Sequence, residues 1–472
     1  MNNPANRDAR AYIISSAQPD FATATRFVNA LIRTGVVVHT APYTFTQGGK
    51  NYPAGSYIVK TNQAFRPHII DLFEPQDHPN DFQYPGGPPV PPYDAAGWTL
   101  AYSMGISFDR IMENVDGPFT RIPDGEVQPL KGKMENKTTK VGYILNSANN
   151  HSFIAVNELL KNGIPVFRIE EASEGLAKGS FFVSAKAKDW LQKNATSLGA
   201  DVTAVDKKPS SMKQIKPSRI ALWDVYGGSM ASGWMRWIME QYHFNAEVIY
   251  AGDINKGDLN KKYDVILFVE GAMPPLGSTG VSRTSAGPKV EDTPEEFKRT
   301  LGNISVDKSI PALKSFLEEG GSIVTIGNST SLAYHLNIPV RDALKEMVNG
   351  KERSLPSEKY YIPGSILQIA VDNEAQAAWG MGSKADVYFE ASPVFTIAPD
   401  AQTKGTVKPI AWFASDKTLR SGWAWGQSYL KDGVAAFSAT VGKGTLYAFG
   451  PEITFRAQTH GTFKFVFNQL YK

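Results

Sequence analysis

Residues 320–332 limit the fold of this 472-residue chain more than any other stretch. A pair of glycines precedes five residues rich in β-branched side chains, and a sharp turn at Gly327, Asn328 and Ser329 leads into a segment of helical character. The pattern predicts a buried strand that turns directly into a helix. Such an elbow is where α/β enzymes present a catalytic nucleophile. The chain has no cysteine, so an elbow suited to a thiol nucleophile lacks one.

Composition places the chain among ordinary globular proteins and excludes several functions. At 472 residues, with 42% apolar and 20% charged residues, it is expected to form roughly two to four domains. A net charge of +3 without a basic cluster argues against a nucleic-acid partner. The absence of cysteine excludes disulfides and thiolate metal sites. No apolar run approaches the roughly 18 residues of a membrane span, and the polar start has no signal-peptide pattern.

The first part of the chain contains an internal repeat. A strand is expected at 11–15, and a helix after the N-cap Asp20 that ends at Gly35. The same order returns at 141–145 and 156–163, and residues 178–183 match 54–59 in type. We predict two copies of a small α/β unit that pack together or share a sheet. The copies are expected at residues 1–76 and 138–206.

The segment 77–137 is interpreted as a proline-rich strap and connection. Five prolines among the eleven residues 84–94 exclude a helix or a central strand. An ordered strap across a domain face is favoured, and a polyproline ligand for a partner is the alternative. Residues 207–216, polar and flanked by prolines, are interpreted as a linker.

Several runs resemble a known family. Residues 53–57, 66–68, 73–79, 84–89 and 92–100 resemble the region downstream of the catalytic domain in large bacterial zinc-carboxypeptidase-like proteins. None of the seven histidines is followed by glutamate three residues later, so the family's zinc motif is absent from this chain. The resemblance implies a companion region without metal or other cofactor, with zinc expected only in a separate peptidase half. It also implies a periplasmic or secreted location.

Residues 218–472 are expected to form a flavodoxin-like doubly wound domain. Strand and helix patterns alternate, and a site is expected at the carboxyl ends of the strands. The glycine turn at Gly227 and Gly228 is favoured as a tight turn, with a phosphate cradle as the alternative. The polar insert 274–306 is interpreted as a lid or interface, and 355–433 as a β-rich elaboration.

This domain resembles the class I glutamine-amidotransferase-like family. That family has a cysteine at the elbow and a His-Pro-Glu sequence near the C-terminus. Asn328 or Ser329 stands at the elbow here, and Gly450 precedes Pro451 and Glu452. Because both the sulfur and its base are missing, the cysteine mechanism is excluded.

Three functions follow from these patterns. The first is a non-catalytic accessory module that supports or gates a peptidase half in cis or in trans. The second is a hydrolase with the catalytic residues Ser329, Glu452 and His460. The third is a glycan- or peptide-binding module that uses the insert and aromatics such as Trp423 and Trp425. The candidate ligand-binding residues are Asn328, Gly227, Gly228, Glu270 and Arg456.

Overall fold

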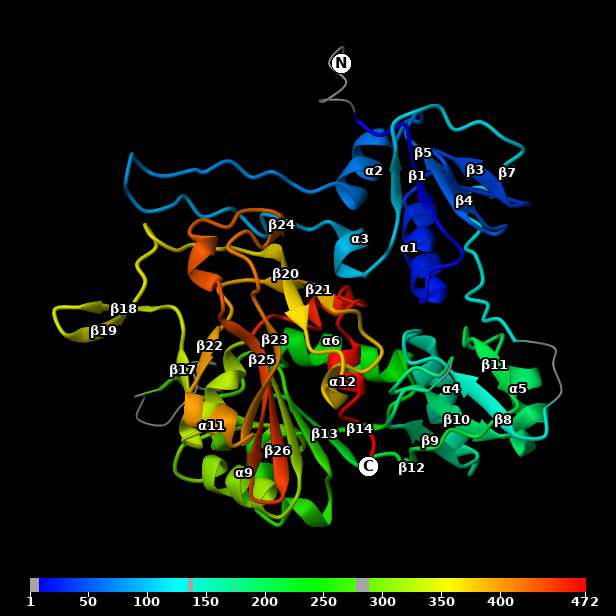
Figure 1. Ribbon diagram of the computed structural model, residues 1–472. Helices are drawn as coiled ribbons and strands as arrows, with labels where there is room; N and C mark the ends of the chain where they lie inside the picture. Colours follow the sequence, from blue (N-terminus) through cyan, green and yellow to red (C-terminus); the bar gives the residue numbers. More distant parts are fainter. Residues whose placement is uncertain (1–7, 135–138, 174, 277–287) are drawn as a thin grey trace. The chain divides into compact units, whose positions relative to one another are not determined.

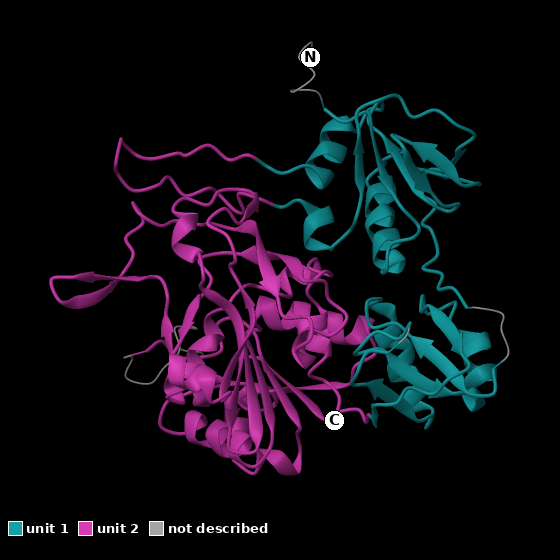
Figure 2. Ribbon diagram, in the orientation of Figure 1, with its two compact units in different colours: residues 1–76, 98–214 teal, residues 77–97, 215–472 magenta. Residues whose placement is uncertain are grey.

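A computed structural model describes residues 8–134, 139–173, 175–276 and 288–472. The chain divides into two compact units (Figure 2). Unit 1 comprises residues 1–76 and 98–214, and unit 2 comprises 77–97 and 215–472. The fold is multidomain α/β, as predicted: unit 1 holds two small antiparallel sheets with helices, and unit 2 is built on one large mixed sheet (Figure 1).

The two sheets of unit 1 have the same strand order. The first runs β6-β1-β5-β2-β7 and the second β11-β8-β10-β9-β12, and all neighbouring strands are antiparallel. The strands of the first are β1 (Ala11–Ile14), β2 (His39–Thr40), β5 (Tyr57–Lys60), β6 (Asp109–Ile111) and β7 (Thr120–Arg121). Those of the second are β8 (Gly142–Leu145), β9 (Val166–Ile169), β10 (Phe181–Ser184), β11 (Val202–Val205) and β12 (Met212–Gln214). The predicted repeat is therefore confirmed as a repeat of topology.

Helices occupy equivalent places in the two copies. α1 (Phe21–Arg33) follows β1, and α4 (His151–Lys161) follows β8. Asp20 caps α1, as predicted, by accepting a hydrogen bond from the Thr23 N–H at 3.1 Å. The remaining elements of unit 1 are α2 (Arg66–Phe73), α3 (Leu100–Ser103), α5 (Lys188–Asn194) and the hairpin β3 (Phe45–Gln47) and β4 (Lys50–Tyr52).

A matched serine holds the same loop in each copy. The hydroxyl of Ser56 accepts a hydrogen bond from the Ser16 N–H at 3.1 Å. The hydroxyl of Ser180 accepts from the Ser147 N–H at 3.4 Å. Both serines are buried, so each bond satisfies a backbone donor that water cannot reach. The sequence match between 54–59 and 178–183 thus has a structural cause.

The two copies are joined by polar contacts inside unit 1. Asp20 also accepts a hydrogen bond from the Asn150 N–H at 3.1 Å, and Arg26 Nε donates to His151 Nε2 at 3.0 Å. Burial lowers the pKa of His151 to about 4, so its ring is neutral near pH 7 and can accept this bond. The copies therefore pack together, and each keeps its own sheet.

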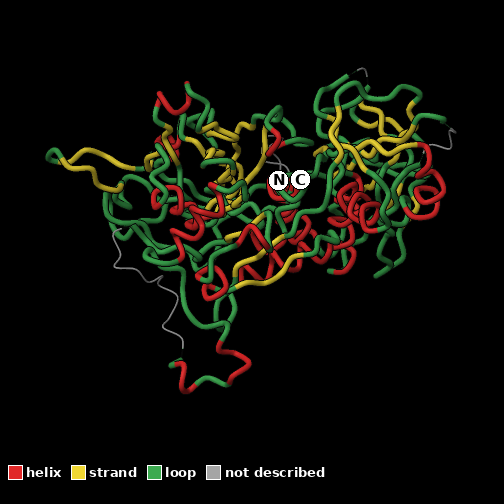
Figure 3. Tube along the Cα trace, turned by 90° about the horizontal axis from the view of Figure 1, so that it is seen from below, coloured by secondary structure: helices red, strands yellow, loops and turns green. Residues whose placement is uncertain are grey.

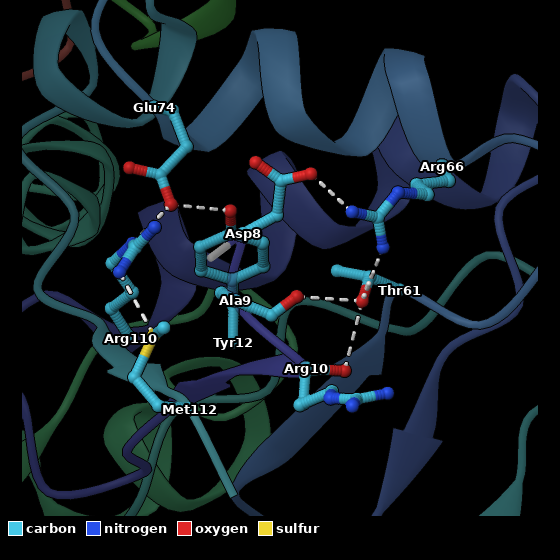
Figure 4. Close-up of polar contacts among 9 residues, drawn as sticks. All are labelled: Asp8, Ala9, Arg10, Tyr12, Thr61, Arg66, Glu74, Arg110 and Met112. Carbon is cyan, nitrogen blue, oxygen red and sulfur yellow. Dashed lines mark hydrogen bonds and ion pairs between the residues drawn. The ribbon is translucent and has the colours of Figure 1, made fainter. Parts of the chain in front are cut away.

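A cluster of polar and charged side chains lies beside the first sheet (Figure 4). The Glu74 carboxylate accepts hydrogen bonds from the Tyr12 hydroxyl and from Arg110 Nε, both at 2.6 Å. Beside them Arg66 pairs with Asp8. The Tyr12 ring stacks on Phe73 with 4.2 Å between centroids, so the same tyrosine belongs to the aromatic core. We interpret this group as structural, because its charged members are all paired.

The linker prediction for 207–216 is wrong in part. β12 lies within this segment and pairs with β9 at the edge of the second sheet. The residues of β12 are half-buried or exposed, so the segment has no hydrophobic alternation to predict a strand. Backbone pairing with β9 and the packing of the half-buried Met212 against the core of the second sheet stabilise this strand.

Unit 2 contains a doubly wound sheet. Its parallel part has the order β14-β13-β15-β16-β26. These strands are β13 (Ile220–Trp223), β14 (Ala246–Ile249), β15 (Val265–Phe268), β16 (Ser322–Ile326) and β26 (Gly444–Phe449). Numbered along the chain the order is 2-1-3-4-5, the flavodoxin-like arrangement that was predicted. Helix α6 (Met230–Gln241) packs on β13, and α9 (Ser309–Glu318) packs on β16 and β26.

The β-rich elaboration extends the same sheet with antiparallel strands. Beyond β26 the order continues as β25-β23-β20-β21. The strands are β20 (Ser365–Val371), β21 (Lys384–Phe389), β23 (Val407–Trp412) and β25 (Val434–Val441), with β17 (Val340–Asp342), β22 (Phe395–Ile397) and β24 (Leu419–Ser421) beside them. The hairpin β18 (Lys345–Val348) and β19 (Lys351–Ser354) projects from the unit in Figure 1 and in Figure 3. The remaining helices are α7 (Ala251–Asn255), α8 (Glu295–Lys298), α10 (Leu332–His335), α11 (Pro399–Thr403) and α12 (Lys464–Phe467).

The proline-rich strap packs on the elaboration of unit 2. Trp423 Nε1 donates to the Asn80 side chain at 2.8 Å, and the His78 ring stacks on Trp423 with 5.1 Å between centroids. Trp423 is only 2% exposed. Its indole is therefore occupied by the strap and is not free to line a glycan cleft.

Candidate functional site

Gly327, at the elbow after β16, has a left-handed backbone conformation. The backbone passes from β16 into a 3-10 turn (Gly327–Ser331) and then into α10. Gly327 has φ of +61°, a region that residues with a side chain rarely occupy. A Cβ at this position would lie 2.2 Å from Glu452 Oε1. The sharpest point of the elbow therefore has no side chain, and a carboxyl group occupies the space that one would fill.

Ser329 lies two residues further on in the same turn, where it is buried and its hydroxyl both donates and accepts a hydrogen bond. Its hydroxyl donates to the Val269 carbonyl at 2.5 Å and accepts from the Ala272 N–H at 2.9 Å. The side chain is 0% exposed. These bonds fasten the loop after β15 to the elbow, and they leave the hydroxyl proton engaged with a backbone carbonyl.

The predicted catalytic group is not assembled around Ser329. His460 lies before α12, where its Nδ1 is 3.2 Å from the Tyr242 hydroxyl and its ring packs against Phe463. The hydrogen bonds of Ser329 go to backbone atoms, and none joins it to His460 among the residues that the structure describes. Of the three predicted residues, Glu452 is the one whose carboxyl group lies against Gly327.

Three glutamates interact at the elbow. Glu270 follows β15, Glu390 follows β21, and Glu452 follows β26. Burial first, and then the negative charge of Glu270, raise the pKa of Glu452 well above its ordinary value. The same two causes raise the pKa of Glu390. Glu452 is therefore held in its neutral, protonated form at pH values where a free carboxyl group would be ionised.

Two other predicted ligand-binding residues lie beside these glutamates. The Asn328 side chain accepts from the Gly271 N–H at 2.7 Å and has its Nδ2 3.4 Å from Glu270 Oε1. Arg456 makes a two-pronged ion pair with Asp94 of the strap at 3.0 to 3.2 Å. Arg456 also has φ of +46°, a strained value of the kind that clusters at functional sites.

Gly227 and Gly228 lie elsewhere on the same edge of the sheet, in a cavity of about 950 Å³. The cavity opens where β13 and β14 end, at the β14 edge of the sheet. The strand order reverses on the other side of β13, between β13 and β15, and no residue of β15 lines the cavity. Both glycines have positive φ, and a Cβ on either would meet nothing within 4 Å.

An acidic side chain already accepts hydrogen bonds from backbone N–H groups of the glycine turn. Asp224 Oδ1 accepts hydrogen bonds from the Val225 N–H at 2.8 Å and the Ser229 N–H at 2.7 Å. A carboxylate thus takes the donors that a phosphate would use, and its charge would repel one. The arrangement favours the tight turn over the phosphate cradle.

The rest of the cavity combines carboxylates, arginines and aromatic rings. Part of the insert forms one wall through Glu296, Phe297, Arg299 and Thr300. Residues 277–287 of the predicted insert lie outside the described part of the chain. Arg299 lies over the Tyr250 ring, 5.4 Å from its centroid, and Arg236 pairs with Glu240 at 3.0 Å. The acidic groups Asp224, Glu240, Glu247 and Glu296 outnumber these two arginines.

Sequence reasoning missed several of these groups. Asp224 directly follows β13, and an acidic residue at the end of a parallel strand was an available signal. Glu390 gave no such signal, because it ends an antiparallel strand of the elaboration. No group of three or more His, Asp or Glu side chains is placed to hold a metal ion in the described residues. No helix in that part of the chain is long and apolar enough to cross a membrane.

Comparisons with known proteins add little to this geometry. No family model matches the sequence, and no curated protein matches it. Solved structures with a similar fold include a ThuA-like protein from Bacteroides uniformis, with 10% identity and a TM-score of 0.30 over 55% of this chain and 95% of that one. A GMP synthase-like protein from Thermoplasma acidophilum has 11% identity and a TM-score of 0.30 over 53% of this chain and 94% of that one.

A β-galactosidase from Bacillus circulans is similar over a smaller share of its own length. It has 13% identity and a TM-score of 0.29 over 53% of this chain. This chain spans only 30% of that β-galactosidase. Scores this low carry no argument, and the flavodoxin-like fold of unit 2 is established by its strand order.

Proposed function

We propose that this chain is a non-catalytic accessory module of a zinc-carboxypeptidase-like protein. It would support or gate a peptidase half supplied in cis or in trans, with zinc bound only by that half. The supporting observation is the elbow, where Gly327 stands at the sharpest point and the carboxyl group of Glu452 fills the place of a side chain. An α/β enzyme needs a nucleophile and a neighbouring base at such a position.

Ser329 is a poor substitute for the missing nucleophile. Its hydroxyl is buried and donates to the Val269 carbonyl, so attack on a substrate would first break two hydrogen bonds. A histidine that could take the hydroxyl proton is absent from its hydrogen bonds among the described residues. The geometry therefore favours the accessory role over the serine hydrolase.

The test measures zinc content and hydrolysis with the whole chain. After incubation with zinc and dialysis, we expect far less than one zinc per chain and no turnover of peptide, ester or amide substrates. The Ser329→Ala variant should give the same background in every assay. One tightly bound zinc per chain would refute the proposal that zinc is bound only by a separate peptidase half. Turnover that is lost in Ser329→Ala and kept in an Asn328→Ala control would establish the serine hydrolase instead.

A second observation supports a ligand-binding role for unit 2. The cavity at β13 and β14 joins carboxylates, which accept hydrogen bonds from hydroxyl and amide groups, to the rings of Tyr226, Tyr250 and Phe297. This combination suits a short glycan or peptide. Such binding is compatible with an accessory module that presents a substrate to a separate peptidase.

The binding test is an array of short peptides and oligosaccharides, with calorimetry on any positive. We expect Phe297→Ala, which removes a half-exposed ring of the cavity wall, to weaken binding by about tenfold. The control is Val290→Ala, an exposed residue of the same insert that does not line the cavity. Equal losses in the two variants, or no binding on the array, would count against the cavity as the site.

A further inference from the structure

The proline-rich strap of unit 2 begins as a hairpin that is fastened to its own unit. Its first arm, residues 81–83, is joined to the second arm, residues 88–90, by backbone hydrogen bonds of 2.9 and 3.0 Å. The Phe82 ring of the first arm packs edge-on against Trp425, with 4.9 Å between centroids. The second arm is therefore held in place through the first.

The chain is fastened again immediately after this arm. Asp94 makes the ion pair with Arg456 at 3.0 to 3.2 Å. Two residues later the Ala96 N–H donates a hydrogen bond of 2.7 Å to the Gly364 carbonyl. The run of residues 88–93 is thus anchored at both of its ends, and its position on unit 2 is defined.

Prolines determine the backbone conformation of this run. A proline ring holds φ at about −65°, and a residue that precedes a proline is restricted to the extended region. Each of the residues 88–92 either is a proline or precedes one. The run therefore adopts the polyproline II conformation, which has about three residues per turn.

Burial within the run repeats with the same period of three. Pro89 is buried and Pro92 is half-buried. Val90 and Tyr93, which follow them by one residue, are 37% and 106% exposed. Pro91 is exposed as well. One edge of the polyproline helix therefore packs on unit 2, and the other edges face solvent.

The exposed edges carry groups that a protein partner can bind. The carbonyls of Val90, Pro91 and Pro92 accept no hydrogen bond among the residues that the structure describes. A polyproline II helix has no internal hydrogen bonds, so these carbonyls are open to external donors. The Tyr93 ring packs on nothing in unit 2, and an aromatic ring on a rigid backbone loses little conformational entropy when it is bound.

We propose that residues 88–93 are a ligand for a protein domain with an aromatic-lined groove that binds polyproline helices. Such grooves recognise a preformed polyproline II segment of this kind. Residues 77–97 contain no lysine or arginine, and the exposed Asp81, whose carbonyl accepts from the Val90 N–H, makes no ion pair in the described part of the chain. The partner's groove therefore has a neutral or basic rim, because an acidic rim would repel this carboxylate.

This inference goes beyond the accessory role, and its test requires neither zinc nor a peptidase. The buried edge makes the run a strap, and the exposed edges make it a ligand. The two interpretations of the proline-rich segment are therefore compatible.

The experiment is calorimetry of the whole chain against two purified domains with aromatic-lined grooves, a WW domain and an EVH1 domain. A synthetic peptide of residues 84–94 is titrated in parallel. We expect the chain to bind at least one domain, and to bind it at least as tightly as the peptide does, because the strap is already ordered. The proposal is overturned if the peptide binds and the chain does not, or if neither binds.

Variants locate the binding on the exposed edges. Tyr93→Ala and Pro91→Ala should each weaken binding by about tenfold or more. Both residues are exposed, so urea unfolding should show that the variants remain folded. The control is Tyr43→Ala, a tyrosine of unit 1 that is 72% exposed and should bind as the unmodified chain does. Unchanged binding in both strap variants, or an equal loss in the control, would overturn the proposal.

Discussion

Replacing Gly327 by alanine tests the geometry of the elbow most directly. Two penalties act on this variant. An alanine held at a left-handed φ costs about 1–2 kcal/mol. The new Cβ would also lie 2.2 Å from Glu452 Oε1, and overpacking of this kind costs about 1–3 kcal/mol. We therefore expect Gly327→Ala to lower the free energy of unfolding of unit 2 by about 2–5 kcal/mol.

Tryptophan fluorescence during urea unfolding measures this loss. Two of the nine tryptophans, Trp98 and Trp190, lie in unit 1, so the other seven report on unit 2. Gly257→Ala is the matched control, because Gly257 has φ of +70° and its Cβ would meet nothing within 4 Å. The control isolates the backbone penalty, and Gly327→Ala should exceed it by the cost of the clash.

A double variant separates the clash from the backbone strain. In Glu452→Ala the carboxyl group is gone, so adding Gly327→Ala should cost only the backbone penalty. The two changes should be non-additive by about 1–3 kcal/mol, as expected for residues in contact. The reasoning would be refuted if Gly327→Ala cost no more than Gly257→Ala, or if the two changes were simply additive.

Three further predictions concern pH and the repeat. Because the raised pKa of Glu452 makes the folded chain hold a proton that the unfolded chain loses, stability should fall as the pH rises above the ordinary carboxyl range. Glu452→Gln should remove this decline, a relative gain of at most about 1.4 kcal/mol per pH unit. Stability that changes with pH in the same way in the variant and the parent would contradict this prediction. The pKa of His151, which burial lowers to about 4, acts in the opposite sense: unit 1 should lose stability as the pH falls from about 6.5 towards 4. His151→Gln should reduce that loss of stability in thermal melts. An unchanged dependence of the melting temperature on pH in this variant would contradict the prediction. In the repeat, Ser56→Ala should lower the free energy of unfolding by about 1–3 kcal/mol, because it leaves the Ser16 N–H unpaired. Ser180→Ala should lower it by less, because the hydrogen bond from the Ser147 N–H is 3.4 Å long. Hydrogen exchange at Ser16 and Ser147 measures both effects, and equal or absent effects would show that the matched serines do not stabilise the repeat.

Local patterns predicted the elements that carry their own signal. The run of β-branched residues before Gly327 forms β16, and Asp20 caps α1 as its position before an apolar-periodic segment indicates. The repeat was visible because each copy needs the same buried strand faces and the same serine under its loop. Polar edge strands such as β12 gave no signal, since their stability comes from a neighbouring strand and the core beside it.

The candidate site depended on contacts between distant parts of the sequence. Glu270, Glu390 and Glu452 are separated by more than sixty residues in each case, and they meet because β15, β26 and the elaboration end near the same elbow. The left-handed φ of Gly327, and not the identity of Asn328 or Ser329, marks the point where a nucleophile's side chain would stand.

The sequence by itself therefore determined the alternation of strands and helices, the repeat and the absence of a thiol, because hydrophobic period, capping and composition are local properties. Tertiary structure alone decided which side chains share the elbow, which hydroxyl is locked by the backbone and where a cavity opens. Those features depend on the order of strands in the sheet, and that order is set by packing between residues far apart in the chain.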